Sequence, residues 1–152
     1  MEIPVSFPLD NDGYLRRECP ACEHEFKWHH GESPGRPDDA IEPEQYVCPM
    51  CGVPAGHDQW FTQAQIEYQQ EMVQFHLSDI VGDELTGQFR GSKGITFKKG
   101  RNTAPAPTEL SEPNDMVIVE PPCHPWEPVK VHEERADAAP LYCLICGSQY
   151  SA

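Results

Sequence analysis

Residues 19–22 read Cys-Pro-Ala-Cys and residues 48–52 read Cys-Pro-Met-Cys-Gly, and these two stretches decide the fold. Two cysteines separated by two residues hold one metal ion from a tight turn, and a tetrahedral site needs two such turns. Pro20 and Pro49 stiffen the turns, and Gly52 can adopt the positive φ with which such a turn often ends. The pattern predicts a four-ligand metal site, here called site 1, formed by Cys19, Cys22, Cys48 and Cys51.

The same form recurs later in the chain, where residues 143–147 read Cys-Leu-Ile-Cys-Gly. Of the seven cysteines, only Cys123 stands outside a C-x-x-C pair, and it precedes residue 143 by a suitable loop length. These three thiols leave one position of a second metal site, here called site 2, to be filled. The candidates for this fourth ligand are His124, His132 and Glu127.

Local geometry favours His124 as the fourth ligand of site 2. Pro125 pushes His124 towards extended conformations, in which its side chain and that of Cys123 would point to opposite faces. Pro122 and Pro125 also frame the pair, however, and a bend between them would bring both side chains round. His132 lies beyond a short predicted strand, so only a hairpin would return it. The sequence therefore predicts that site 2 is formed by Cys123, His124, Cys143 and Cys146, with His132 as the alternative fourth ligand.

The arrangement C-P-x-C…C-P-x-C-G over residues 14–53 resembles zinc ribbons, and the tail over residues 123–147 resembles the C-terminal zinc ribbons of small bacterial proteins. The resemblance implies small antiparallel β modules that hold structural Zn²⁺, two per chain, and that present surfaces to proteins or nucleic acids. Residues 48–52 also resemble the second knuckle of rubredoxins, which hold iron for electron transfer. Glu23 departs from the rubredoxin pattern, because a glycine would be expected there, so zinc is preferred over iron.

Composition limits both the size of the core and the class of partner. The chain has 152 residues, of which 38% are hydrophobic, 16 are prolines and 11 are glycines, so small modules are expected rather than one large apolar core. The net charge of −14 argues against a surface that binds nucleic acid or anionic membrane over its whole extent. Since no apolar run is long enough for a membrane span and no leader is evident, we expect a cytoplasmic protein with reduced thiols.

The predicted fold class is small α+β, with two zinc-stabilised antiparallel β-ribbon modules connected by an amphipathic helix and a Pro-rich linker. The expected segments are an N-terminal ribbon at 1–57, the helix at 58–91, a basic Gly-rich segment with the Pro-rich linker at 92–115, and a C-terminal ribbon at 116–152. Short strands are expected beside each C-x-x-C pair and over residues 116–120 and 128–131, with a loop over residues 132–140.

Helical spacing begins just after the first predicted ribbon. Thr62 is placed as the N-cap and Gln65 as its partner in a capping box. Apolar residues then recur three, four or seven positions apart, as on one face of a helix. These are Ile66, Val73, Leu77, Ile80, Val81, Leu85 and Phe89. Gly82 or Gly87 is expected to end or break the helix. We expect the apolar face to pack on the adjacent ribbon, with pairing against a partner's helix as the alternative.

Together these features favour a non-enzymatic interaction or adaptor protein with protein partners. The alternative is a nucleic-acid-binding protein that uses the basic, Gly-rich residues 90–101. The basic residues there are Arg90, Lys93, Lys98, Lys99 and Arg101. A rubredoxin-like iron electron carrier and a zinc hydrolase with an open position at site 2 rank below both. Because the sequence contains no H-E-x-x-H motif and no H-x-E followed by P-C-x-x-C, catalysis is not expected.

Overall fold

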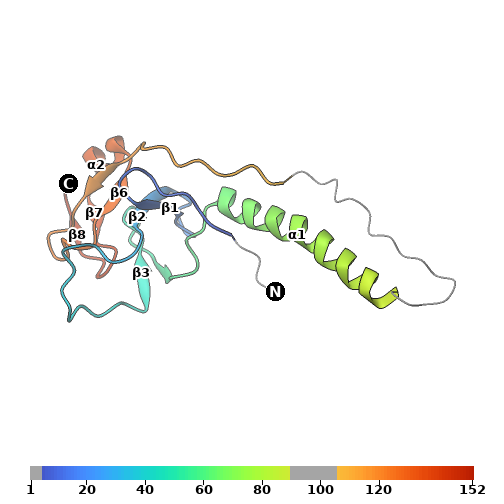
Figure 1. Cartoon of the computed structure of the whole chain (residues 1–152). Coiled ribbons are helices and arrows are strands. Elements are labelled where there is room, and N and C mark those ends of the chain that lie inside the picture. Colours follow the sequence, from blue (N-terminus) through green and yellow to red (C-terminus); the bar gives the residue numbers. More distant parts are fainter. Residues whose placement is uncertain (1–4, 90–105) are drawn as a thin grey trace. The chain divides into compact units, whose positions relative to one another are not determined.

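The computed structural model describes residues 5–89 and 106–152. It divides into two compact units, which are described separately. One unit joins residues 7–63 to residues 111–152 and contains every described strand, whereas the other contains helix α1 (Gln63–Phe89) from residue 64 onward. Figure 1 shows these elements in sequence colours. The prediction of a small α+β protein with antiparallel sheets is confirmed.

The described strands form four antiparallel hairpins. β1 (Tyr14–Glu18) pairs with β2 (Glu25–His29), β3 (Gln45–Val47) with β4 (Pro54–Gly56), β5 (Val117–Val119) with β6 (Val129–Val131), and β7 (Leu141–Tyr142) with β8 (Gln149–Tyr150). β2 also pairs with β6, which produces one four-stranded sheet in the order β1-β2-β6-β5. Because strands from both ends of the chain share this sheet, the predicted division into separate ribbon modules at 1–57 and 116–152 is not confirmed.

The four-stranded sheet has an approximate two-fold relation between its halves. Its central strands, β2 and β6, run antiparallel with Lys27 opposite Lys130. On each side of this pair, the next strand outward is the other member of the same hairpin. The two hairpins β1–β2 and β5–β6 therefore meet edge to edge in equivalent ways.

The other two hairpins repeat this relation. Val47 N donates to Leu144 O at 2.8 Å, and Tyr142 N donates to Pro49 O at 2.9 Å. In both bonds the donor precedes the first cysteine of one C-x-x-C pair, and the acceptor follows the first cysteine of the other pair. The C-x-x-C form that recurs along the sequence thus occupies equivalent positions in the two halves of one compact unit.

One face of the four-stranded sheet carries the apolar core. Side chains alternate between the faces of a strand, so Phe26 and Trp28 of β2 share a face with Val129 and Val131 of β6. Phe26 and both valines are fully buried, and the ring of Trp60 packs against Phe26 with 5.6 Å between centroids. The same core cluster contains Cys19, Cys48 and Cys143. The cysteine pairs therefore lie against the core of this unit.

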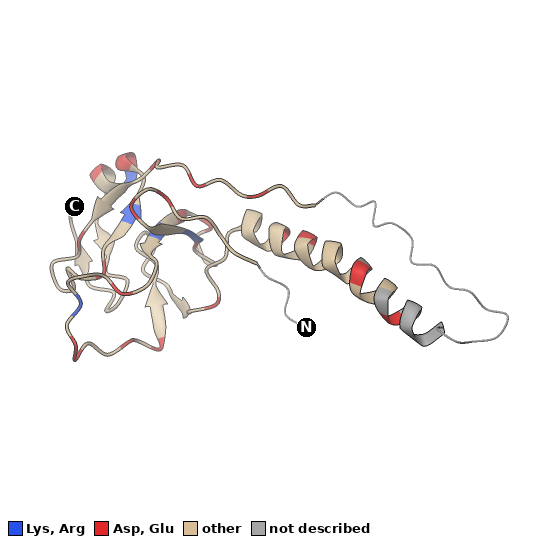
Figure 2. Ribbon diagram, in the orientation of Figure 1, with Lys and Arg blue, Asp and Glu red and all other residues tan. Residues whose placement is uncertain are grey.

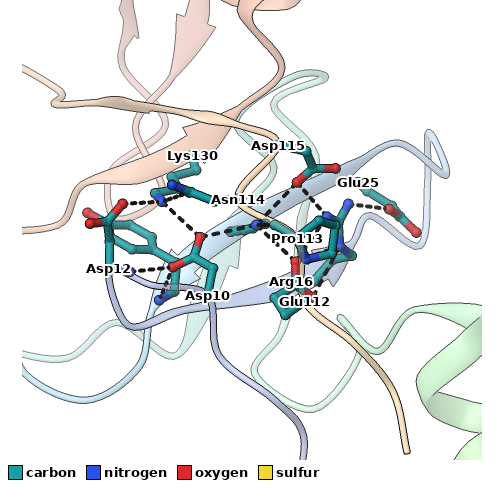
Figure 3. Close-up of polar contacts among 11 residues, drawn as sticks. Asp10, Asp12, Arg16, Glu25, Glu112, Pro113, Asn114, Asp115 and Lys130 are labelled. Atoms are coloured by element: carbon teal, nitrogen blue, oxygen red, sulfur yellow. Dashed lines mark hydrogen bonds and ion pairs between the residues drawn. The ribbon is translucent and has the colours of Figure 1, made fainter.

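The opposite face of the sheet carries two buried lysines. The side chains of Lys27 and Lys130 are 0% and 1% exposed, and both Nζ atoms bind Oδ2 of the fully buried Asp10, at 3.1 and 2.8 Å. Lys130 Nζ also binds Asp12 Oδ2 at 2.7 Å. Figure 3 shows the Asp10 carboxylate turned towards Lys130. Because a buried ammonium group is costly unless it is paired and hydrogen-bonded, these acids are what permits lysines at the centre of the sheet.

A short acidic stretch, residues 112–115, covers the same face. Glu112 and Asp115 each pair with Lys27, at 2.9 and 3.2 Å, and with Arg16 of β1, at 2.9 and 2.6 Å. Pro113 O accepts a hydrogen bond from Lys27, and Asn114 Oδ1 accepts one from Lys130 (Figure 3). Figure 2 shows the acidic residues along the chain that enters β5 and the basic residues on the strands. The last residues of the predicted linker, 111–115, therefore belong to the compact unit.

The pKa values follow from these contacts. Burial alone would raise the pKa of Asp10, but hydrogen bonds from Lys130, the Tyr14 amide and Lys27 outweigh burial and hold it well below its ordinary value. Burial likewise opposes the charged forms of Lys27 and Lys130, but their carboxylate partners raise both pKa values. A lowered folded-state pKa means that Asp10 stabilises the fold above its unfolded pKa of about 3.9 and loses that contribution as the pH falls further.

Helix α1 begins directly after Thr62, as predicted for an N-cap, and continues through Gly82 and Gly87 to Phe89. The prediction that one of these glycines ends the helix is therefore wrong. Val73, Leu77 and Val81 are 44 to 49% exposed, so the expected packing of this apolar face on a ribbon stays a prediction. Within the described ranges, no helix has both the length and the apolar character needed to cross a bilayer.

A second, short helix, α2 (Glu133–Ala138), replaces part of the loop predicted for residues 132–140. Glu133 and Glu134 lie in its first turn, where acidic side chains interact favourably with the helix dipole. Arg135 anchors it, because its guanidinium donates to Ala139 O and Pro140 O and, at 3.0 Å, to Met50 O. The loop prediction is therefore wrong for residues 133–138, and the bond from Arg135 to Met50 joins parts of the chain that are distant in sequence.

We predict that Asp10→Asn destabilises the fold by about 3–5 kcal/mol, because it removes the charge that two buried lysines share. Asp12→Asn is the matched control, since Asp12 is 48% exposed and, among the described residues, forms its ion pair with Lys130 alone, so it should cost at most about 1 kcal/mol. Urea unfolding of the metal-loaded proteins at neutral pH measures both values. Equal effects of the two substitutions would contradict the central role of Asp10.

Candidate metal centres

Each of the four hairpins carries two of the eight predicted metal ligands in the connection between its strands. The pairs are Cys19 and Cys22 in β1–β2, Cys48 and Cys51 in β3–β4, Cys123 and His124 in β5–β6, and Cys143 and Cys146 in β7–β8. The first two hairpins bring their donors together as site 1, and the last two as site 2. Within each site, all four donor atoms lie within 4.8 Å of one another.

The three C-x-x-C connections share one backbone conformation, here called the knuckle. The N–H of the first cysteine donates to the carbonyl five residues later, and the N–H four residues later donates back to the carbonyl of that cysteine. The forward bonds are Cys19 to His24, Cys48 to Val53 and Cys143 to Ser148, at 2.9 to 3.1 Å. The return bonds are Glu23 to Cys19, Gly52 to Cys48 and Gly147 to Cys143, at 2.9 to 3.0 Å.

The fifth residue of the knuckle requires positive φ. Gly52 and Gly147 have φ of 75° and 76°, and Glu23, in the equivalent position, has φ of 61°. Glu23 is the only residue other than glycine with positive φ among the described residues. Its side chain makes this conformation costly. The departure from the expected glycine, visible in the sequence, is thus a point of backbone strain rather than a different turn.

Site 1 has the geometry of a closed four-thiol cluster. Cys19 Sγ lies 3.6 Å from Cys51 Sγ, and Cys22 Sγ lies 3.8 Å from Cys48 Sγ, so the close pairs join the two hairpins. The amides of Ala21 and Cys22 donate to Cys19 Sγ at 3.3 and 3.4 Å. The amides of Met50 and Cys51 donate in the same way to Cys48 Sγ. Amide donors of this kind stabilise sulfur in its thiolate form.

In site 2, two consecutive turns position the Cys-His pair. His124 N donates to Pro121 O at 3.2 Å, and Glu127 N donates to His124 O at 3.0 Å, with Pro122 and Pro125 second in their turns. Proline is favoured at that position because its φ is already correct. The bend overcomes the extended tendency before Pro125. His124 Nδ1 consequently lies 3.4 Å from Cys143 Sγ.

The remaining pair of site 2 is more exposed. Cys123 Sγ lies 3.5 Å from Cys146 Sγ, and both residues are exposed, whereas Cys143 is buried. The His124 ring packs edge-on against Trp126 with 5.1 Å between centroids. His132 is not among the four clustered residues; it is exposed and serves as the N-cap residue of α2. Glu127, the other candidate ligand, is also outside the cluster, and its Oε1 lies 3.7 Å from Nη1 of Arg36.

Burial and hydrogen bonds shift the pKa values of several thiols in the two clusters. Burial raises the pKa of Cys48 well above its ordinary range, that of Cys143 to about 12 and that of Cys22 to about 11. Desolvation also acts to raise the pKa of Cys146, but hydrogen bonds with Ser148 outweigh it and bring the pKa to about 6. Thiols this close cannot all ionise by themselves, because each thiolate opposes the next. A bound metal cation removes that obstacle.

The donor atoms fit a tetrahedral metal ion. With metal–sulfur bonds of about 2.3 Å and a metal–nitrogen bond of about 2.0 Å, neighbouring sulfurs lie about 3.8 Å apart and nitrogen lies about 3.5 Å from sulfur. The close contacts at 3.4 to 3.8 Å approach these values, so both clusters could hold a metal ion.

The basic residues predicted to contact nucleic acid lie outside the described residues. These are Arg90, Lys93, Lys98, Lys99 and Arg101.

We predict that Glu23→Gly stabilises the metal-loaded protein by about 0.5–1 kcal/mol, because glycine adopts positive φ without a steric cost. The reverse change, Gly147→Ala, should destabilise it by about 1 kcal/mol, since an added Cβ makes only an ordinary 3.5 Å contact with Val47 and the cost is backbone strain. Chemical denaturation measures both differences. Loss of stability in Glu23→Gly would show that the Glu23 side chain contributes more than its conformation costs.

Comparison of the chain with family models, with curated proteins and with solved structures finds no match. The interpretation of the two clusters therefore depends on their own geometry and donor chemistry.

Proposed function

We propose that the chain is a non-enzymatic interaction protein that holds two structural Zn²⁺ ions, one at each cluster. The observation that carries the proposal is the gathering of eight donors from four separate hairpins into two groups of four. The Cys₃His set of site 2 is typical of structural zinc, and the Cys₄ set of site 1 suits zinc equally well. Iron would fit site 1 also, but the strained Glu23 separates this knuckle from the rubredoxin pattern.

The closed donor sets support a structural rather than a catalytic role. A catalytic zinc ion keeps one position for water or substrate beside three protein ligands. The hydrolase alternative requires that the fourth coordination position of site 2 be open. His124 instead lies beside the three thiols, where it can fill that position. Zinc binding would supply folding free energy to hairpins whose strands have only two to five residues. The nucleic-acid alternative depends on residues 90–101 and stays a prediction.

Two cavities beside site 2 support a specific surface for partner contact. They measure about 320 and 360 Å³ and share four lining residues, Arg36, Glu42, Tyr46 and Glu127. Trp126 lines the first cavity and Trp28 lines the second. Ser33 Oγ donates to Trp126 O, which ties the loop between β2 and β3 to the turn that carries site 2.

The lining of these cavities suits a partner that presents arginine or lysine. Carboxylates attract cationic groups, and both Glu42 and Glu127 line the two cavities. Glu42 accepts a hydrogen bond from Tyr46 Oη at 3.0 Å and is 57% exposed, so its carboxylate is available to a further donor. Of the four residues that line both cavities, two are acidic, Glu42 and Glu127, and one is basic, Arg36. The net charge of −14 would also attract a basic protein.

The metal proposal predicts two zinc ions per purified chain and a loss of one in His124→Ala. His132→Ala is the matched control and should keep both, because His132 lies outside the cluster. Elemental analysis after gel filtration measures the stoichiometry. Two zinc ions retained in His124→Ala would contradict the Cys₃His assignment, and iron in place of zinc would contradict the choice of metal.

The partner proposal predicts that short peptides rich in arginine or lysine bind more tightly than neutral peptides of the same length. Glu42→Gln should weaken this binding about three- to tenfold, which corresponds to roughly 1 kcal/mol. Glu44→Gln is the matched control, since Glu44 is exposed nearby but lines neither cavity. Fluorescence anisotropy of labelled peptides measures the affinities. Equal binding of basic and neutral peptides would contradict the proposal.

A further inference from the structure

The two metal sites differ in how far their thiols are exposed to solvent. At site 1, Cys19 and Cys48 are buried, and Cys22 and Cys51 are half-buried. At site 2, Cys123 and Cys146 are both exposed. A dissolved oxidant can therefore reach two sulfurs of site 2 directly, whereas at site 1 no thiol belongs to an exposed residue.

The exposed pair at site 2 is also close enough to react with itself. The Sγ atoms of Cys123 and Cys146 lie 3.5 Å apart, so they must approach by only about 1.5 Å to form a disulfide bond of about 2 Å. The close pairs of site 1, at 3.6 and 3.8 Å, differ little in separation. Exposure, rather than distance, is what distinguishes the two sites.

We propose that site 2 is a peroxide-sensitive modification site, at which Cys123 and Cys146 are oxidised to a disulfide and the zinc ion is released while site 1 keeps its own. The inference rests on the proposed function, because it assumes that both sites hold zinc. It adds a chemical difference between two sites that otherwise share one design.

The reaction balances with hydrogen peroxide as the oxidant. One thiolate attacks a peroxide oxygen, the O–O bond breaks, and a sulfenic acid forms with release of hydroxide. The second thiolate attacks the sulfenic sulfur, the S–S bond forms, and a second hydroxide leaves. Two protons from solvent convert the hydroxides to water, so two electrons pass from the sulfurs to the peroxide. Zinc keeps its oxidation state and loses two of its four ligands.

The positions of the two cysteines determine the structural result of oxidation. Cys123 lies in the β5–β6 connection and Cys146 in the β7–β8 connection, so the disulfide would join the same two hairpins that the metal ion joins. The oxidised unit should consequently stay folded. His124 and Cys143 would be released as ligands, and His124 lines the cavity that also contains Trp126 and Tyr46.

The test treats the full, zinc-loaded chain with hydrogen peroxide and monitors zinc with a chromophoric chelator. We expect one zinc ion per chain to be released at least about tenfold faster than the other. Peptide mapping after alkylation should place the disulfide between Cys123 and Cys146, with all four site 1 cysteines alkylated only after unfolding. Thiol reductant with added zinc should restore two zinc ions.

Several outcomes would overturn the proposal. Release of both zinc ions at one rate, a disulfide among site 1 cysteines, or a disulfide between Cys143 and Cys146 would each contradict it. Retention of both zinc ions with unmodified Cys123 would contradict it as well. Zinc content before treatment separates this failure from failure of the proposed function, since fewer than two zinc ions in the untreated chain would refute the latter. Because the unsubstituted protein carries both sites, site 1 serves as the internal control.

Discussion

The mutual repulsion of thiolates within a few ångströms of one another is the constraint on which the rest of this structure depends. Each cluster gathers four donors from two hairpins, and burial makes several of these thiols harder to ionise, Cys48 and Cys143 among them. A divalent cation would turn this electrostatic obstacle into a crosslink between hairpins. Since the hairpins β3–β4 and β7–β8 have strands of only two or three residues, such crosslinks would help to hold them beside the core.

The four-stranded sheet meets a second electrostatic constraint of the opposite sign. Its central pair, Lys27 and Lys130, is buried on the face opposite the apolar core. Asp10 bridges the two lysines, Asp12 pairs with Lys130, and residues 112–115 supply further acceptors to both lysines on that face. The two faces of the sheet are therefore different environments. On one face, cysteines pack among aromatic and aliphatic side chains, and on the other, buried lysines pair with carboxylates. Residues 112–115 are held against this face by ion pairs and hydrogen bonds.

The sequence predicts those features that depend on short-range spacing. The C-x-x-C pairs, the turns around them and the adjoining strands are local features. The prolines on both sides of Cys123 and His124 likewise pointed to His124 as the fourth ligand of site 2. Features that depend on contacts between distant residues were missed. The pairing of β2 with β6 has no local signal, nor does the bond from Arg135 to Met50 that anchors α2. The acids of residues 112–115 resembled a solvated linker because their basic partners lie far away in sequence.

The approximate two-fold relation links these observations, because each half of the unit contributes one strand pair to the central sheet and one cluster of donors. The two halves differ in the chemistry of their metal sites, because site 2 contains a histidine ligand and two exposed thiols. X-ray absorption at the zinc edge tests this account most directly. Averaged over the two sites, it should show about 3.5 sulfur neighbours at about 2.3 Å and about 0.5 nitrogen at about 2.0 Å per zinc ion. A shell of four sulfurs without nitrogen, or one that contains water oxygen, would contradict the account.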